Sequence, residues 1–227
     1  MVLSNHLSIR LIFFLALVFS LSTFAGEAAQ LVRLVGKVHV IKPDKTDIEL
    51  KLNDMVSEGD TILTEKDTFA MLLFTDNAET ILRPSSELKI IEYNFLKEEP
   101  GRDKSIANLI KGGLRRMTGL CGKRGNPDAD KLITATSTVG IRGTIYDVIV
   151  CAGNCDKLDN GTYFSVKEGQ ISIKNDAGEQ LISAGQFAYT SNYVSKTVPL
   201  NKDPGIPPMN PSKPMEPNNN SGSNCAA

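Results

Sequence analysis

Apolar and polar residues alternate with a period close to two through most of the chain between Leu31 and Tyr193. Such alternation is typical of β-strands with one face buried and the other exposed to water. We therefore expect a series of half-buried strands. The clearest apolar positions of the pattern are Val38, Val40, Ile48, Leu50, Leu52, Ile171 and Ile173.

Turn-forming residues separate these segments at short intervals. Gly, Asn, Asp and Pro favour turns because they tolerate positive φ, bond their own backbone or fix its geometry. Many short strands with regular turns predict an all-β fold, either a single sandwich or roll or a short β-solenoid, with at most one short helix. The turn segments are Lys42–Asp44, Glu58–Asp60, Thr75–Asn77, Arg83–Ser85, Asp159–Gly161, Lys167–Gly169, Asn175–Gly178 and Ala184–Gly185.

Two segments depart from simple alternation. Phe69–Phe74 is apolar almost throughout, which predicts a central strand covered on both faces. Ser105–Lys111 places three apolar residues on one helical face just before two glycines. A helix of two turns and a strand both fit this second segment.

The segment Thr134–Asp147 carries the most specific pattern, because Gly140 and Gly143 interrupt a run of β-branched residues. We interpret it as a strand, a tight corner and a second strand. Arg142 either contacts an anion or partner, or donates hydrogen bonds to carbonyl groups across the corner, a role that suits its five N–H donors. The candidate corner residues are Gly140, Ile141, Arg142, Gly143 and Thr144.

The N-terminal residues have the features of a secretory signal peptide. A basic residue precedes an apolar block that is short for a membrane span, and small residues follow it. We expect a signal peptide over residues 1–25, with cleavage after Ala28 or Ala29 and an uncleaved anchor helix as alternatives. The mature chain is then periplasmic or secreted, with no later membrane span.

The C-terminal residues differ in composition. Residues 199–227 are rich in proline and asparagine and contain few apolar side chains. Such a segment buries too little surface to offset the entropy lost on ordering, so we predict a disordered tail that could also dock on a partner as a polyproline segment. One β domain is expected over residues 30–198.

Charge and histidine content exclude several classes of function. Lys and Arg number 25 against 26 Asp and Glu, so no broad basic field is available for nucleic acid. Of the two histidines, His6 lies in the signal peptide and His39 in an alternating strand. Triads and zinc sites that need histidine cannot form. We expect no enzyme, no metal and no cofactor.

Basic residues gather around the glycines of Gly119–Gly125, which does not match a phosphate-binding loop because Met117 replaces its first glycine. Such a cluster is either a solvated loop or a binding site for an anionic glycan or lipid head group. The candidate anionic-ligand residues are Arg115, Arg116, Lys123 and Arg124.

The four cysteines suit an exported chain. Cys151 and Cys155 are close enough in sequence to form a disulfide across a turn between two strands. Cys121 and Cys225 are left over, either as free or variably paired thiols or as a second bond that would order the tail.

Four segments carry a resemblance to a known family, namely Val56–Thr64, Ala70–Pro84, Gly112–Arg115 and Thr134–Thr144. Together they resemble the FecR domain over roughly Val35 to Ala188. The resemblance implies an extracytoplasmic, β-rich module. Its best-known members sense an outer-membrane receptor and control a sigma factor through a cytoplasmic domain, which is not found in this chain. One departure is Asn77-Ala78, where the family usually has Gly-Ser or Gly-Thr.

These observations favour a non-enzymatic, exported module that binds a protein partner in the cell envelope, through an exposed sheet edge or the corner at Arg142. The alternative is an envelope-structural or anionic glycan-binding protein that uses the basic loop.

Overall fold

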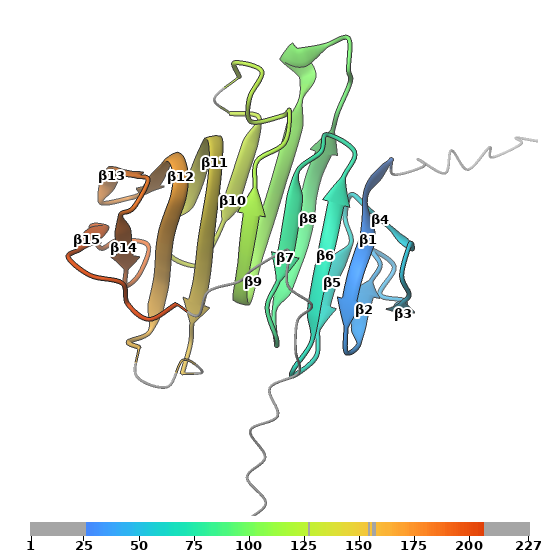
Figure 1. Cartoon of the computed structure of the whole chain (residues 1–227), viewed down its shortest axis with the longest axis horizontal. Helices are drawn as coiled ribbons and strands as arrows, with labels where there is room; N and C mark the ends of the chain where they lie inside the picture. The colour runs from blue at the N-terminus through green and yellow to red at the C-terminus, as the bar shows by residue number, and fades with distance from the viewer. Residues whose placement is uncertain (1–25, 127, 154, 156–157, 207–227) are drawn as a thin grey trace, which may run out of the picture.

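The computed structural model describes residues 26–206 apart from 127, 154, 156 and 157. The predicted signal peptide and residues 207–227 of the predicted tail lie outside the described residues. Figure 1 shows the strands side by side along the long axis, from the N-terminal strands (blue) to the C-terminal strands (red). All fifteen strands belong to one hydrogen-bonded sheet, and its pairings divide it into two layers.

The first layer contains six strands that lie wholly within it and halves of three long strands. The six are β4 (Met55–Ser57), β1 (Glu27–Val35), β6 (Phe69–Phe74), β7 (Glu79–Leu82), β14 (Phe187–Thr190) and β15 (Val198–Leu200).

The second layer also contains six whole strands. They are β3 (Asp47–Leu50), β2 (Val38–Ile41), β5 (Thr61–Thr64), β8 (Glu87–Asn94), β10 (Asp130–Ile133) and β13 (Gly178–Ser183). The three long strands that belong to both layers are β9 (Lys104–Met117), β11 (Thr138–Cys151) and β12 (Gly161–Asn175).

Each long strand changes layer at a glycine with positive φ. Gly112 has φ of 77° in β9, Gly143 has φ of 62° in β11, and Gly169 has φ of 71° in β12. Positive φ is nearly free of steric cost only for glycine. Pairing between β11 and β12 is interrupted from Arg142 to Ile145, so a bulge accompanies the bend. The predicted corner therefore joins two halves of one continuous strand.

Side chains from both layers form one hydrophobic core. Leu72 of β6 and Phe164 of β12 come from the first layer, and Leu88 of β8 and Ile171 of β12 come from the second. All four are almost completely buried. The alternation read from the sequence thus corresponds to side chains directed into and away from a sandwich core.

The structure confirms the all-β prediction, and it shows that the segment compatible with both helix and strand is a strand. Ser105–Lys111 lies within β9, because its apolar residues pair across two neighbouring strands of the second layer. The helix in the described residues is the 3-10 turn η1 (Pro100–Arg102). None in this part of the chain has the length and apolar character needed to cross a membrane. Phe69–Phe74 is central, between β1 and β7, as expected.

The C-terminal boundary differs from the prediction. Pro199 and Leu200 lie in β15, which pairs with β14, and Ile206 is 7% exposed among apolar side chains. The composition predicts a tail from residue 199, because the segment is rich in proline and asparagine and has few apolar side chains to bury. At the edge of a sheet, however, a proline needs no partner for its missing N–H group.

The predicted disulfide between Cys151 and Cys155 is present, with Cα atoms 5.5 Å apart. Cys121 is a buried free thiol, and burial raises its pKa well above the ordinary value. Because the thiolate is the reactive form, this cysteine is chemically inert. Cys225 lies outside the described residues.

Alanine at three glycines of the β11 and β12 corners should destabilise the fold in a fixed order. Gly140→Ala places its Cβ in ordinary contact with Ser172, so the change is within about 0.5 kcal/mol. Gly143→Ala forces positive φ on alanine, for about 1 kcal/mol. Gly169→Ala adds a clash, 2.5 Å from the Gly143 carbonyl oxygen, so about 2 kcal/mol or more is lost. Urea unfolding measures the series. Equal losses of unfolding free energy for Gly140→Ala and Gly169→Ala would show that the glycine at the β12 corner is not needed for its backbone conformation.

Candidate functional site

The candidate site forms where the loop of residues 118–126, which follows β9, packs on the corner of β11. Thr118 and Thr144 join the two segments. The Thr144 carbonyl oxygen accepts hydrogen bonds from the Thr118 amide and hydroxyl, both at 2.9 Å, and the Thr144 amide donates to the Thr118 hydroxyl at 3.0 Å. Thr144 therefore has a structural role, and Ile141 is buried in the core.

Asp76, in the turn between β6 and β7, anchors the middle of this loop. Its carbonyl oxygen accepts from the Leu120 amide at 2.8 Å, and its carboxylate accepts from the Cys121 amide at 3.0 Å. Gly119 packs so closely on this turn that a Cβ there would overlap the Ala78 amide nitrogen. The loop is thus held by several bonds before any ligand binds.

Arg124 anchors the far end of the loop. Its guanidinium donates to both carboxylate oxygens of Asp103, at 2.9 and 2.6 Å, and to the carbonyl oxygens of Leu96 and Lys97. It also lies over the ring of Phe95, 4.8 Å from the centroid. The arginine predicted to bind an anionic ligand is therefore occupied by groups of this chain.

The prediction that Arg115 belongs to a basic surface loop is also wrong. This residue lies in β9, not in a loop, and donates to both oxygens of Asp147 on β11, at 2.9 and 2.8 Å. Its side chain is 10% exposed. The two glycines before it suggested a loop, whereas they mark the bend of a strand.

Arg116 is buried on the opposite face of β9, directed into the sandwich. It donates to Ser105 at 2.7 Å and to Asp130 at 3.1 Å, and its guanidinium lies over the ring of Phe74. Of the four residues predicted as one basic cluster, Lys123 alone is exposed to solvent and has no ion pair within the described residues. The four do not form a common surface.

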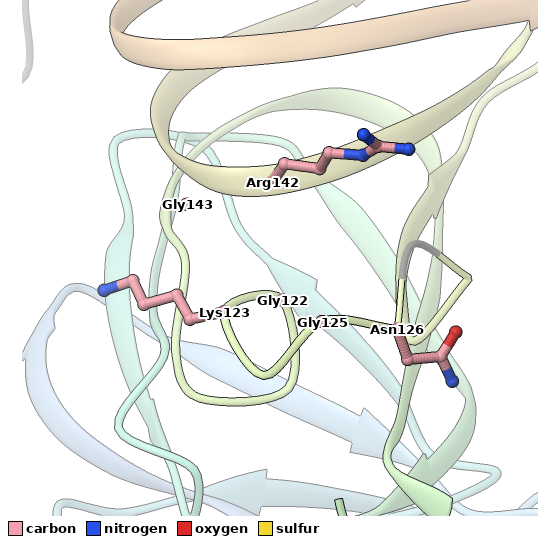
Figure 2. A pocket seen from close by; sticks show the side chains of 6 residues that line it. All are labelled: Gly122, Lys123, Gly125, Asn126, Arg142 and Gly143. Carbon is pink, nitrogen blue, oxygen red and sulfur yellow. The ribbon is translucent and has the colours of Figure 1, made fainter. Parts of the chain in front are cut away.

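Lys123 instead lines a cavity with Arg142. This cavity, of about 450 Å³, has the residues Gly122, Lys123, Gly125, Asn126, Arg142 and Gly143 along its walls. Figure 2 shows Arg142 extending across one side of the cavity and Lys123 extending in the opposite direction. The two head groups therefore do not converge on one small anion, but together they line a positively charged surface.

A second depression, of about 490 Å³, continues from Arg142 over the outer face of the second layer. Its floor is flat at Gly140, which has no side chain and pairs with Lys131 on one side and Ser172 on the other. Leu181 of β13 borders it and is 52% exposed. Arg142 lines both depressions, and we call their combined surface the corner site.

The charges of the corner site are unbalanced. Lys131 forms an ion pair with Asp128 at 2.8 Å, and Glu179 accepts a hydrogen bond from Ser172. Arg142, in contrast, is exposed, and its side chain makes no hydrogen bond or ion pair with any described residue. The predicted structural role, hydrogen bonding to carbonyl groups across the corner, is therefore not seen. Its guanidinium remains available to carboxylate or phosphate groups.

A buried polar cluster lies directly beneath this surface. A Cβ on Gly122 would be 3.2 Å from Asp130 Oδ2, which is buried without a hydrogen-bond partner among the described residues. Burial raises the pKa of Asp130 to about 6, although the neighbouring Arg116 opposes the shift. Tyr146 pairs with Arg116 across the strands, and burial raises the pKa of its hydroxyl as well.

The described residues contain no group of three or more His, Cys, Asp or Glu side chains placed to hold a metal ion. His39 on β2 lies on the surface beside Asp47, with 3.0 Å between Nδ1 and the carboxylate. No sequence pattern indicates Lys174 or Asn126 as site residues, because the folded chain brings them beside Arg142 from distant positions in the sequence.

Comparison with known proteins adds little. No protein-family model and no curated protein matches the sequence. Two crystal structures of a proposed anti-sigma factor from Parabacteroides distasonis ATCC 8503 are similar, with 13% identity and a TM-score of 0.49. The match covers 64% of this chain and 61% of that chain. A structure described as a cell surface anchoring domain has 24% identity and a TM-score of 0.27 over 27% of this chain and 82% of its own. We base no functional assignment on these scores.

The titration of Asp130 should leave a signature in the pH dependence of stability. Because its pKa in the folded chain lies above the ordinary value of 3.8 for an aspartate, the folded state binds more protons than the unfolded state between about pH 4 and pH 6. This residue therefore makes the free energy of unfolding fall as pH rises through that window. Asp130→Asn should remove this contribution, and it should also lower stability overall because Arg116 loses its charged partner.

The measurement is the unfolding free energy at several pH values for wild type and Asp130→Asn, with the exposed Asp176→Asn as control. An unchanged difference between wild type and Asp130→Asn from pH 4 to pH 6 would show that Asp130 does not titrate there.

Proposed function

We propose that this chain is an exported, non-enzymatic module that binds a protein partner in the cell envelope through the corner site. The observation that carries the proposal is Arg142, a guanidinium exposed on a firmly anchored surface and unpaired among the described residues. An arginine that stabilised the corner would donate to nearby carbonyl groups. An unpaired guanidinium on an anchored segment of backbone instead suits recognition of a carboxylate on a partner.

The lining of the corner site supports a macromolecular partner. The two depressions share Arg142, and most of their lining side chains are polar or charged, with an exposed leucine at one border. Small-molecule pockets are lined predominantly by apolar and aromatic side chains. An extended segment of a protein with acidic and apolar side chains would match both Arg142 and Leu181.

Export and family are inferred from other observations. The disulfide between Cys151 and Cys155 suits an oxidising compartment such as the periplasm, and the N-terminal residues have the composition of a signal peptide. The FecR-like segments, including Gly140–Thr144, favour a sensing or signalling role within the envelope. We infer that role without the control of a sigma factor.

Anionic glycan is the second candidate ligand. Lys123, Arg142 and Lys174 all border the corner site, so a polyanion could follow it. Binding of this kind is electrostatic and weakens steeply as salt rises. Dextran sulfate binding that weakens as salt rises through 0.1 M (about a 10 Å screening length) and falls with Arg142→Ala would favour this candidate, and binding that is absent or insensitive to salt would remove it.

Arg142→Ala should abolish partner binding while changing the free energy of unfolding by no more than about 0.5 kcal/mol, because it removes no internal bond seen in the described residues. A photo-crosslinking amino acid at position 142, in cells, identifies the partner by mass spectrometry of the adduct. The same amino acid at Glu49, exposed on β3 at the other end of the molecule, is the matched control (Figure 1).

The expected result is one discrete adduct at position 142 and none at position 49. No adduct at 142, or the same adduct at both positions, would contradict a partner site at the corner. A large loss of stability in Arg142→Ala would return this arginine to a structural role.

A further inference from the structure

Arg115 and Arg116 are adjacent in β9, and each guanidinium faces one buried carboxylate. Arg115 donates from both Nε and Nη2 to Asp147, at 2.9 and 2.8 Å, which closes a fork of two hydrogen bonds. Arg116 donates to Asp130 from Nη2 alone, at 3.1 Å. The fork between Arg116 and Asp130 is therefore half open, although these two side chains are only 3% and 0% exposed.

Both atoms on the open side of this fork are buried without a hydrogen-bond partner among the described residues. They are Arg116 Nε, which is a donor, and Asp130 Oδ2, which is an acceptor. Covalent geometry places Nε beside Nη2 and Oδ2 beside Oδ1, so the two atoms flank the single bond that is made. Thr80 and Ser105 accept from the Nη atoms of Arg116, at 3.1 and 2.7 Å, and hold the guanidinium in this orientation.

Tyr146 brings a third such atom to the same place. This residue pairs with Arg116 across β11 and β9, so the two side chains are neighbours on one face of the sheet. Burial raises the pKa of the Tyr146 hydroxyl, and the charges of Arg116 and Asp130 both act on it. The hydroxyl is buried and has no hydrogen-bond partner within the described part of the chain, whereas a buried tyrosine hydroxyl usually has one.

We propose that Arg116 Nε, Asp130 Oδ2 and the Tyr146 hydroxyl together bind one internal water molecule. Water accepts a hydrogen bond from the guanidinium, donates one to the carboxylate and bonds the hydroxyl in either sense. A cation cannot accept from Nε, and an anion cannot donate to Oδ2. Internal waters make about three hydrogen bonds to polar groups that the protein leaves unsatisfied, which is the number that this site offers.

Asp76 is a second carboxylate whose charge acts on Asp130, but it does not compete for this water. Its Oδ1 accepts from the Ala78 amide at 3.1 Å and from the Tyr93 hydroxyl at 3.3 Å. Its Oδ2 accepts from the Cys121 amide at 3.0 Å. Both oxygens of Asp76 are thus bonded within the chain, so the water is directed to Asp130.

The water site lies beneath the corner site. A Cβ on Gly122 would be 3.2 Å from Asp130 Oδ2, and Gly122 also lines the cavity that contains Lys123 and Arg142 (Figure 2). The backbone of Gly122 therefore lies between Asp130 and the cavity, and local opening of this loop is the route by which the water exchanges. The water also links β9, β10 and β11, and so helps to fix the surface that displays Arg142.

Nuclear magnetic resonance of the folded wild-type chain from Gly26 to Ala227 tests the site without any substitution. The Nε–H proton of Arg116 should show cross-relaxation with water, with Overhauser effects of opposite sign in the laboratory and rotating frames, as a long-lived bound water gives. The Nε–H proton of Arg115, bonded directly to Asp147, is the matched control and should show none. Tyr146→Phe should abolish the signal at Arg116, and Tyr163→Phe, outside the main core, should leave it unchanged.

Equal cross-relaxation at the two arginines, none at Arg116, or an unchanged signal in Tyr146→Phe would each overturn the water site. If Tyr146→Phe does not fold, a high-resolution crystal structure of the wild-type chain answers the same question. One water oxygen within hydrogen-bonding distance of all three atoms is expected, with none between Arg115 and Asp147. A closed fork between Arg116 and Asp130, or a sodium or chloride ion at the position of the water, would contradict the proposal.

Discussion

The fold depends on three strands that each belong to both layers of the sandwich. β9 crosses between the layers at Gly112, which pairs with Val150 of β11. β11 and β12 cross at the opposite end of the paired strands, where Ile145 of β11 pairs with Met117 of β9. The layers are thus joined covalently at both ends of these strands. Because a strand that crosses has one register in each layer, a slip in one layer would disturb the pairing in the other. Glycines with positive φ make these crossings sterically acceptable.

Buried charges fix the register of the central strand. Arg115 and Arg116 are adjacent in β9 and therefore face opposite sides of the sheet, where Asp147 and Asp130 receive them. A slip of one residue would direct each guanidinium to the wrong face and leave two carboxylates unpaired in poorly solvated surroundings. Such an arrangement is very costly. These ion pairs contribute more to the selection of one pairing than to net stability.

The sequence predicts those features that depend on near neighbours. Alternation identified the strands, and the short spacing of Cys151 and Cys155 identified their bond. The burial and ion pairing of Arg115 and Arg116 could not be predicted, because their partners lie 32 and 14 residues away and only the folded sheet brings them together. Ser105–Lys111 stayed ambiguous because three apolar residues fit both periods. Tertiary pairing, not local preference, selects the strand.

The use of carboxylates for internal bonds explains why a nearly neutral chain has a positive corner site. Asp103 and Asp130 hold arginines, and Asp76 holds backbone amides of the loop. These carboxylates lie close to the corner site, but they are buried and already hydrogen-bonded within the chain. Arg142 and Lys123 are left without internal partners in the described chain, so the local charge differs from the net charge of −1. The anchoring that makes the loop rigid is thus also the cause of its unbalanced charge, and rigidity with unbalanced charge is what an interaction surface requires.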